Sequence, residues 1–306
     1  MEVSVVVCEH DVERWGDCRD AAESVLAQTY PETQLVLVSD GSDAVCTAMT
    51  ETYGDHDDVV IECLDENVGL LEARNAGAEA ATGAVVAFLD DDAIADDEWV
   101  AELAAIYTEH DVPAVGGKMT PAWIAGEPRF LPPEFHWLVG VTHAGFADGP
   151  GEVRNTFGSN ISFRRDVFLE LGGFDADIGG RQGDANLQGG ETELCARLQA
   201  EYGYGVYYTP DAEVAHKVFD YRTDLRWLLD RAFWQGYSKR AMAVLVPRST
   251  GAESAFLTHL ITSAAPRRLR SLVSRPSTTK LLRFVMLFVF TAAVGAGYAY
   301  GFLRWR

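Results

Sequence analysis

The sequence predicts an α/β protein in which helices flank a Rossmann-like, mainly parallel sheet. Short runs rich in β-branched residues alternate with helical segments in the first third of the chain, which is the βαβ rhythm of a parallel sheet. The 306 residues, 48% of them hydrophobic, are also enough to bury the core of such a sheet. Toward its end the chain changes character, and there we expect a basic amphipathic helical region followed by one transmembrane helix.

The expected elements follow one another closely along the chain. In order they are a strand at 3–7, a helix near 15–27, a strand at 34–38, a strand near 59–63, a helix around 71–81 and a strand at 85–89. Parallel sheets of this kind bind ligands at the carboxyl ends of their strands. The residues that come directly after each strand are therefore the first place to look for a site.

Carboxylates follow three of these strands. Glu9 comes after the first, Asp40 after the second, and the triplet 90–92 after the strand at 85–89, so all should meet at one edge of the sheet. An acidic triplet alone says little, because about one is expected by chance in so acidic a chain. Its position after a fully apolar strand gives it weight. Carboxylates there suit Mg²⁺ or Mn²⁺, which binds a diphosphate and neutralises its charge.

Charge is distributed very unevenly along the chain. Residues 1–221 carry 11 Lys and Arg against 43 Asp and Glu, whereas residues 222–306 carry 14 against 3. An acidic body with few lysines suits a salt-rich cytoplasm. The basic end is expected to meet an anionic surface, and we favour membrane phosphate over nucleic acid, because nucleic acid would repel the acidic body. No nucleic-acid partner is therefore expected.

A segment without charged residues lies near the end of the chain. Residues 284–303, FVMLFVFTAAVGAGYAYGFL, are long enough to cross a hydrocarbon core of about 30 Å as a helix. Basic residues are denser before this segment than after it. By the positive-inside rule, we expect a single-pass protein of the cell membrane whose catalytic body lies in the cytoplasm. The flanking residues are Arg267, Arg268, Arg270, Arg275, Lys280 and Arg283 before it, and Arg304 and Arg306 after it. A buried core helix is the alternative.

The region before this segment mixes aromatic and basic side chains. Residues 225–246 fit an amphipathic helix at the membrane interface, and equally a helix that packs on the protein's own surface. We expect three parts in all: a catalytic domain at 1–221, basic interface helices at 222–283 and a transmembrane helix at 284–303.

The five cysteines include no CxxC pair, and most lie in or beside apolar segments. We therefore expect all of them to be reduced, buried thiols. Met1 leads directly into the first strand rather than into a secretory signal, which favours a cytoplasmic body.

An ordered series of segments over most of residues 1–220 resembles the inverting glycosyltransferases of family 2, which have the GT-A fold. The segments are VSVVV near the start, SVLAQTYPETQLVLVSDGS at 24–42, NVGLLEARNAGAEAATGAVVAFLDDD at 67–92, GSNISFRR and LGGFDADIGG within 158–180, and GGETELCARL at 189–198. The series as a whole is far more specific than any one motif. It implies a metal-dependent enzyme that uses a nucleotide-activated sugar.

The resemblance implies a nucleotide-sugar site made by Cys8, Glu9, Asp40, Arg74, Asn75, Asp90 and Asp91. Glu9 and Asp40 match positions that contact the nucleoside, and Arg74 and Asn75 match the segment that closes over the nucleotide, although capping or packing would also explain Asn75. Asp90 is suited to the ribose or sugar. The implied metal ligands are Asp92 and His216; a structural histidine is equally consistent, since imidazole binds Mn²⁺ but suits Mg²⁺ poorly.

The segment GGETELCARL matches the place where the family has an acidic general base at the start of a helix. Glu191 matches that base, and Glu193 is a second candidate because the usual Glu-Asp pair is absent. Residues two apart on a helix point in different directions, so only one can face the acceptor. Gly158, Ser159 and Asn160 resemble the loop on the acceptor side.

The implied reaction is a single displacement that inverts the anomeric carbon, with Glu191 removing the proton from the acceptor hydroxyl. A membrane helix with a basic flank suggests a polyprenyl phosphate acceptor, such as dolichol phosphate carrying a glycan. The acidic composition and RAFWQGYSKRA at 231–241 resemble haloarchaeal Agl-type enzymes of surface-layer (S-layer) N-glycosylation, some of which transfer glucuronic acid. A UDP-activated hexuronic acid is therefore the preferred donor.

Two other functions fit parts of the pattern. One is a non-catalytic membrane scaffold that keeps the fold without turnover. The other is a nucleotidyltransferase, although no basic glycine-rich phosphate loop follows the first strand.

Overall fold

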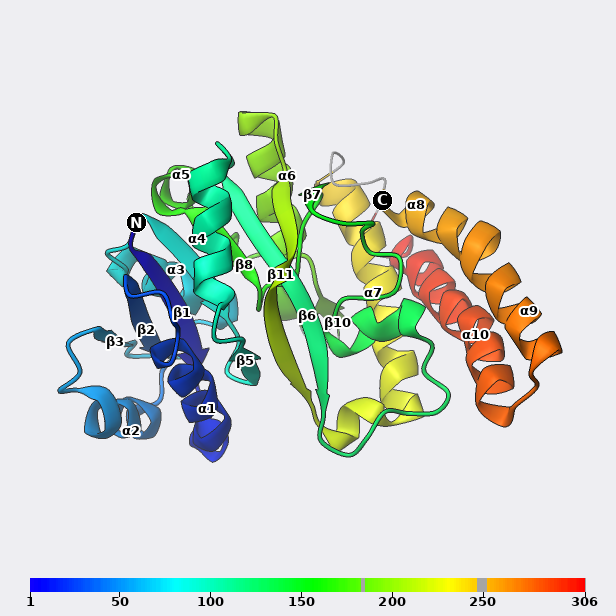
Figure 1. The fold of residues 1–306 in the computed structure, drawn as a ribbon, viewed down its shortest axis with the longest axis horizontal. Helices are drawn as coiled ribbons and strands as arrows, with labels where there is room; N and C mark the ends of the chain where they lie inside the picture. Colours follow the sequence, from blue (N-terminus) through cyan, green and yellow to red (C-terminus); the bar gives the residue numbers. More distant parts are fainter. Residues whose placement is uncertain (183–184, 247–251, 306) are drawn as a thin grey trace. The chain divides into compact units, whose positions relative to one another are not determined.

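The computed structural model describes residues 1–182, 185–246 and 252–305 and divides the chain into two compact units (Figure 1). The first unit comprises Met1–Thr120, Gly149–Gly180 and Gly190–Lys217. The second comprises Pro121–Asp148, Arg181–Gly189 and Val218–Arg306. The α/β fold predicted from the sequence is confirmed, and it occupies the first unit.

A mixed sheet forms the centre of the first unit, with the strand order β3-β2-β1-β4-β8-β6-β11-β5 and with β7 paired to β11. Its strands are β1 (Val3–Glu9), β2 (Thr33–Ser39), β3 (Val59–Cys63), β4 (Val85–Leu89), β5 (Ala93–Ala95), β6 (Ala114–Trp123), β7 (Gly151–Val153), β8 (Ile161–Arg164) and β11 (Val206–Val218). The first four strands pair in parallel, as expected. Antiparallel pairing of β8 with β4 and with β6 extends the sheet on the other side of β4.

Helices cover the sheet of the first unit, and they are η1 (Val12–Arg14), α1 (Trp15–Leu26), α2 (Asp43–Tyr53), α3 (Leu70–Ala80), α4 (Trp99–Glu109), α5 (Arg165–Glu170) and α6 (Gly190–Tyr202). Every residue of β1 is buried, as expected of a central parallel strand with both faces covered. On α1 the buried residues are Cys18, Ala21, Ala22 and Val25, which have the spacing of one helical face.

One prediction about the cysteines is wrong. Cys46 on α2 and Cys63 at the end of β3 form a disulfide, with their Cα atoms 5.7 Å apart. The two residues are 17 positions apart in the sequence, and only the packing of α2 beside the edge strand β3 brings them together. Cys8, Cys18 and Cys195 are free and buried, as expected.

The second unit is mainly helical. It contains η2 (Pro133–Val139), a two-stranded sheet of β9 (Gly180–Gln182) and β10 (Ala185–Leu187), and the helical series η3 (Asp220–Thr223), α7 (Leu225–Leu245), α8 (Ala252–His259), η5 (Leu260–Ala264), α9 (Ala265–Ser274) and α10 (Thr278–Gly301). Among the residues that the structure describes, α10 is the one helix long and apolar enough to cross a membrane. It contains most of the charge-free segment identified in the sequence.

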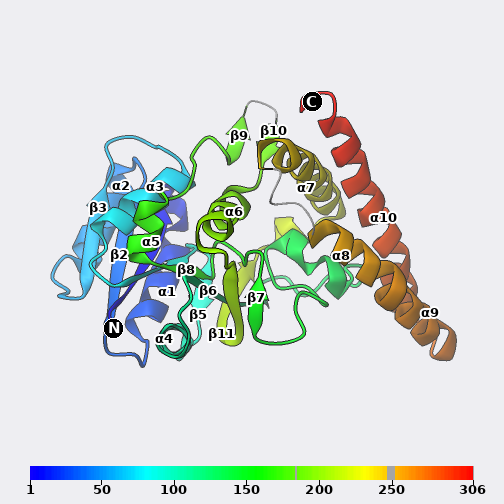
Figure 2. The ribbon, with the colours of Figure 1, turned by 90° about the horizontal axis from the view of Figure 1, so that it is seen from above.

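Helices α7 and α10 lie side by side at backbone contact (Figure 2). A Cβ atom at Gly297 would lie 1.8 Å from the carbonyl oxygen of Phe233, and one at Gly236 would lie 1.9 Å from that of Val294. Small residues therefore allow this close approach, as they do between helices in membranes. The sequence of α7 fitted a helix at the membrane interface and a helix packed on the protein's own surface equally well. In the structure α7 packs one face against α10.

The packing of α3 on the sheet yields a test of the fold. A Cβ atom at Gly77 would lie 2.4 Å from Cγ1 of Val6 and 2.9 Å from Cγ2 of Val38, both in the core. We expect Gly77→Ala to lower the free energy of unfolding by about 1–3 kcal/mol, because β-branched core side chains cannot move aside without strain. Denaturant titration of the full chain measures this. Gly16→Ala on α1, where a Cβ meets nothing within 4 Å, is the control and should be neutral or slightly stabilising; equal effects of the two substitutions would contradict the packing.

Candidate metal centre and active site

The carboxyl ends of β1, β2 and β4 meet at one edge of the sheet. Glu9 pairs in register with Ser39, the last residue of β2, and Val7 pairs with Leu89, the last residue of β4. Asp40 is held beside β1 by a backbone hydrogen bond of 2.8 Å from its N–H to the carbonyl oxygen of Glu9. Three acidic clusters from separate parts of the chain thus lie at the edge where parallel sheets bind ligands.

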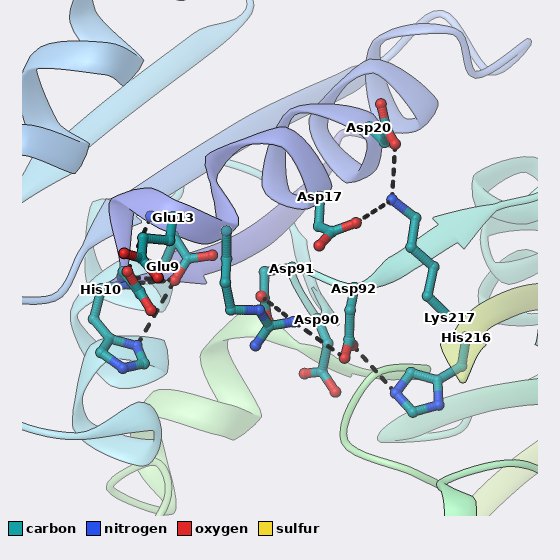
Figure 3. Close-up of polar contacts among 12 residues, drawn as sticks. Glu9, His10, Glu13, Asp17, Asp20, Asp90, Asp91, Asp92, His216 and Lys217 are labelled. Atoms are coloured by element: carbon teal, nitrogen blue, oxygen red, sulfur yellow. Dashed lines mark hydrogen bonds and ion pairs between the residues drawn. The ribbon is translucent and has the colours of Figure 1, made fainter. Parts of the chain in front are cut away.

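A potential metal centre is formed by Asp90, Asp92 and His216. Each offers one ligand atom, and these atoms lie within 4.8 Å of one another. The antiparallel pairing of β11 with β5 places His216 opposite Ala93, and Nε2 of His216 is 3.2 Å from Oδ1 of Asp92 (Figure 3). Asp92 and His216 are buried. Two carboxylates with one imidazole fit Mn²⁺ well, because a nitrogen ligand suits it better than it suits Mg²⁺.

Lysine 217, the next residue on β11, fixes the strand against α1. Its Nζ donates hydrogen bonds of 2.7 Å to both Asp17 and Asp20 (Figure 3). Its backbone N–H donates to the carbonyl oxygen of Asp92 at 2.8 Å. The side chain and the backbone of Lys217 therefore both help to fix the position of His216 relative to the acidic triplet.

Arg14 is a charged residue of this centre that the sequence analysis missed. It ends η1, just after β1, and its Nη2 lies 2.8 Å from Asp91 and 3.2 Å from Asp92. Burial, and then the charge of Asp92, raise the pKa of Asp91 to about 8, and Arg14 offsets part of this rise. Its position shortly after the first strand, in a body with few basic residues, was the available signal.

Arg74 on α3 connects the metal centre to a second carboxylate. It is 2% exposed, and its Nη2 lies 2.5 Å from Oδ1 of Asp90 while its Nη1 lies 3.1 Å from Oε1 of Glu191. The guanidinium also lies over the rings of Phe88 and Phe174. A planar guanidinium can bridge two carboxylates in this way because its donors point in fixed directions.

Gly158 leaves the room that this bridge needs. A Cβ atom there would lie 2.1 Å from Oε1 of Glu191 and 2.7 Å from Nη1 of Arg74. The neighbouring Ser159 accepts a hydrogen bond of 2.9 Å on its Oγ from the N–H of Asp90. Two of the three residues of the expected acceptor loop, Gly158 and Ser159, therefore contact or adjoin the acidic groups of the site.

The two glutamates of α6 have different surroundings. Glu193 is buried, and its two oxygens accept hydrogen bonds of 2.6 Å from Arg197. Arg197 also donates to the carbonyl oxygens of Leu171 and Gly173, so this pair fixes a loop. Glu191 is partly exposed and lies at Arg74, beside the acidic edge. The geometry thus favours Glu191 as the carboxylate available to a bound molecule.

The two carboxylates expected at the nucleoside, those of Asp40 and Glu9, differ in how many of their oxygens accept hydrogen bonds within the protein. Asp40 accepts hydrogen bonds from the N–H groups of Val68 at 2.7 Å and Gly69 at 3.1 Å, which fix the start of α3. Glu9 uses one oxygen for the N–H groups of His10 and Asp11. Its other oxygen is buried and, within the described part of the chain, has no hydrogen-bond partner. Glu9 Oε2 is therefore a buried acceptor atom that still lacks a hydrogen-bond donor.

Three other residues predicted for the site have side chains that are buried or hydrogen-bonded within the protein. The amide of Asn160 is fully buried and makes four hydrogen bonds, to Trp99, Gly117, Lys118 and Ala212. Its oxygen accepts two of these hydrogen bonds and its nitrogen donates the other two, so this side chain has no hydrogen bond left to make with an acceptor substrate. Asn75 holds the backbone of Phe174 through two hydrogen bonds. Burial raises the pKa of the Cys8 thiol to about 12, so this side chain is neutral.

Comparison with known sequences places the chain among glycosyltransferases. Residues 4–172 match the family described as glycosyl transferase family 2. A glucosyl-dolichyl phosphate glucuronosyltransferase of Haloferax volcanii is 47% identical over 304 residues, which cover 99% of this chain and 97% of that protein. Glycosyltransferase AglE of the same organism is 32% identical over 272 residues, which cover 80% of each.

Comparison with solved structures supports the same fold. The mannosyltransferase PcManGT from Pyrobaculum calidifontis, solved in complex with GDP-Man and Mn²⁺, superposes with a TM-score of 0.59. The alignment covers 98% of this chain and 87% of that chain at 17% sequence identity. This likeness shows a GT-A fold.

The metal centre can be tested by binding alone. We expect Asp92→Asn and His216→Ala each to weaken Mn²⁺ binding by at least about 10- to 100-fold, the range seen even for residues that only support a ligand. Titration calorimetry on the purified full chain measures the affinity. Asp17→Asn is the matched control, because Asp17 faces the same strand but lies outside the group of three, and Lys217 keeps Asp20. Unchanged Mn²⁺ affinity in Asp92→Asn would rule out this centre.

Proposed function

The chain belongs to glycosyl transferase family 2, and from this premise we propose that it transfers glucuronic acid from a UDP-activated donor to glucosyl-dolichyl phosphate. The observation that carries the proposal is the 47% identity, over nearly the full length of both chains, to a protein named for that reaction. The acceptor class also agrees with a chain whose basic region precedes an apolar helix. The product is then a lipid-linked disaccharide of an N-glycosylation pathway.

The donor is proposed to bind along the acidic edge of the sheet. Glu9 offers its unpaired oxygen to a hydroxyl or N–H group of the nucleoside. Asp90, Asp92 and His216 have the donor set and spacing to hold a divalent cation, with Mn²⁺ preferred over Mg²⁺. When bound, the cation supplies positive charge to the diphosphate as it leaves. Arg14, which lies against Asp91 and Asp92, adds a second positive charge there.

Glu191 is proposed to act as the general base. In the reaction the acceptor hydroxyl gives its proton to an oxygen of Glu191. The hydroxyl oxygen then forms a bond to the anomeric carbon as the bond from that carbon to the diphosphate breaks. Arg74 holds Glu191 beside Asp90, so the base and the metal ligand keep a fixed separation. Such positioning is a large part of catalysis when two molecules must react in line.

The two glutamates of α6 give a matched test of this role. We expect Glu191→Gln to lower kcat by about 10²- to 10⁴-fold with the KM for the donor little changed, because proton removal is lost while binding is kept. Transfer of labelled glucuronic acid to glucosyl-dolichyl phosphate by the purified chain in detergent with Mn²⁺ measures this.

The control is Glu193→Gln, which removes a carboxylate two residues away. It should lower stability, because Arg197 loses its ion pair, but change kcat much less. A larger loss of kcat in Glu193→Gln than in Glu191→Gln would assign the base to Glu193. Full activity of both variants would show that neither glutamate is the base, and absence of transfer by the wild-type chain would favour a scaffold that does not turn over.

We also propose that α10 anchors the chain in the cell membrane as a single-pass helix with the catalytic unit in the cytoplasm. The support is its length and composition, together with the dense basic residues on its N-terminal side. The packing of α7 along α10 suggests the competing arrangement, in which the pair lies in the plane of the membrane surface. Such an arrangement keeps Arg231 and Lys239 of α7 out of the hydrocarbon.

Cysteine labelling separates these two arrangements. Thr278→Cys and Leu303→Cys place thiols at the two ends of α10, and both positions are exposed. We expect a membrane-impermeant maleimide to reach Thr278→Cys only from the cytoplasmic side and Leu303→Cys only from the opposite side. The native thiols give little background because all three free cysteines are buried. Labelling of both positions from the cytoplasmic side would contradict the single-pass arrangement.

A further inference from the structure

A basic pocket lies where α9 meets the start of α10 in the second unit. It is open, has a volume of about 480 Å³, and is lined by Arg267, Arg270, Ser271, Ser274, Arg275 and Lys280. Four of these positions, 267, 270, 271 and 274, have the spacing of one helical face, so one face of α9 is turned toward the pocket. None of the residues that line it belongs to the acidic edge of the sheet.

The positive charge of this pocket is largely unneutralised. Across residues 1–182, 185–246 and 252–305, no carboxylate lies within ion-pair distance of Arg270 or Arg275, and both side chains are exposed. The ammonium of Lys280 donates only to backbone carbonyl oxygens, those of Ser271 at 3.2 Å and Arg275 at 2.9 Å. Four like charges gathered in one pocket repel one another unless an anion joins them. The pocket therefore has the chemistry of an anion site.

Among the described residues, Arg267 is the one cation of the pocket within ion-pair distance of a carboxylate. Its Nη2 lies 3.4 Å from Glu134, but the same carboxylate takes closer hydrogen bonds from Arg268, at 2.9 and 3.0 Å. The charge of Arg268 and its hydrogen bonds lower the pKa of Glu134 against the effect of burial, so this carboxylate is ionised. Because Arg268 lies outside the pocket and takes most of that charge, Arg267 keeps most of its own for a ligand.

Exposed apolar side chains lie on the same two helices as these cations, on other faces than the one that lines the pocket. On α9, Leu269 and Val273 are 47% and 76% exposed, and at the start of α10, Leu281, Leu282 and Val285 are 50%, 40% and 45% exposed. A soluble anion would need the cations alone. The headgroup layer of a membrane offers phosphates beside acyl chains, which matches cations beside exposed leucines and valines.

We propose that this pocket binds the headgroup phosphate of an anionic membrane phospholipid. The arginines donate charge-assisted hydrogen bonds to the phosphate oxygens, and the exposed leucines and valines enter the adjoining acyl layer. The inference rests on the proposed membrane location of α10. It adds a lipid site that is independent of the transfer reaction.

The test is native mass spectrometry of the full chain in detergent, titrated with phosphatidylglycerol or phosphatidylcholine. We expect the wild-type chain to retain phosphatidylglycerol in preference to phosphatidylcholine. The variant Arg270→Gln/Arg275→Gln should bind phosphatidylglycerol roughly 25-fold more weakly, since each basic residue near an anionic lipid surface is worth a factor of about five. Both side chains are exposed, and neither makes a hydrogen bond or ion pair with the part of the chain that the structure describes, so thermal unfolding of the variant should match the wild type.

The matched control is Arg129→Gln/Arg226→Gln, which removes the same charge from exposed positions of the same unit outside the pocket. Equal losses in the two double variants would show a general charge effect and overturn the proposal, as would no loss in Arg270→Gln/Arg275→Gln. Displacement of the lipid by millimolar glycerol phosphate at constant ionic strength would show that a soluble phosphate is the ligand. Glucuronosyl transfer by the wild-type chain in detergent is measured alongside; its absence would count against the proposed function and leave the lipid result standing.

Discussion

The buried guanidinium of Arg74 is the interaction on which the rest of the site depends. It lies on α3 and joins Asp90, the residue directly after β4, to Glu191 in the first turn of α6, more than a hundred positions later in the chain. A buried arginine is tolerated only when its charge is paired, and here two carboxylates share it. The absence of a side chain at Gly158 is part of the same arrangement, since any Cβ would collide with the bridge. The distance between the candidate base and the candidate metal centre is thus set by one side chain.

Repulsion among carboxylates is the second constraint. Asp90, Asp91 and Asp92 follow one another at a sheet edge that also holds Glu9 and Asp40. The structure relieves this repulsion with Arg14 and Arg74, although burial, and then the charge of Asp92, still raise the pKa of Asp91. A site with excess negative charge attracts a divalent cation, and through it a diphosphate. The acidic edge and the basic pocket at α9 and α10 therefore suit opposite kinds of ligand.

Much of the fold could be predicted because it depends on local patterns. The parallel strands, their order of appearance and the position of the acidic clusters follow from β-branched runs and from what comes after them. The antiparallel strands β8, β6 and β11 carried weaker patterns. The contacts of Arg14 with Asp91 and Asp92, the Cys46–Cys63 disulfide and the close packing of α7 on α10 could not be predicted, because each arises from residues brought together only by tertiary packing. For the same reason the sequence could not show that Asn160 has a structural role. Its sequence context resembles an acceptor loop, but its four hydrogen bonds are all made within the protein.

The central claim is that Arg74 acts on the reaction through Glu191, and a double-mutant cycle on kcat tests it most directly. Arg74→Lys, Glu191→Gln and the double variant would be compared at saturating Mn²⁺ and donor; lysine keeps the charge but cannot bridge two carboxylates. If Arg74 works by holding the base, the double variant will be no slower than Glu191→Gln alone. Losses that multiply, so that the double variant is slower by the product of the two single effects, would contradict this account.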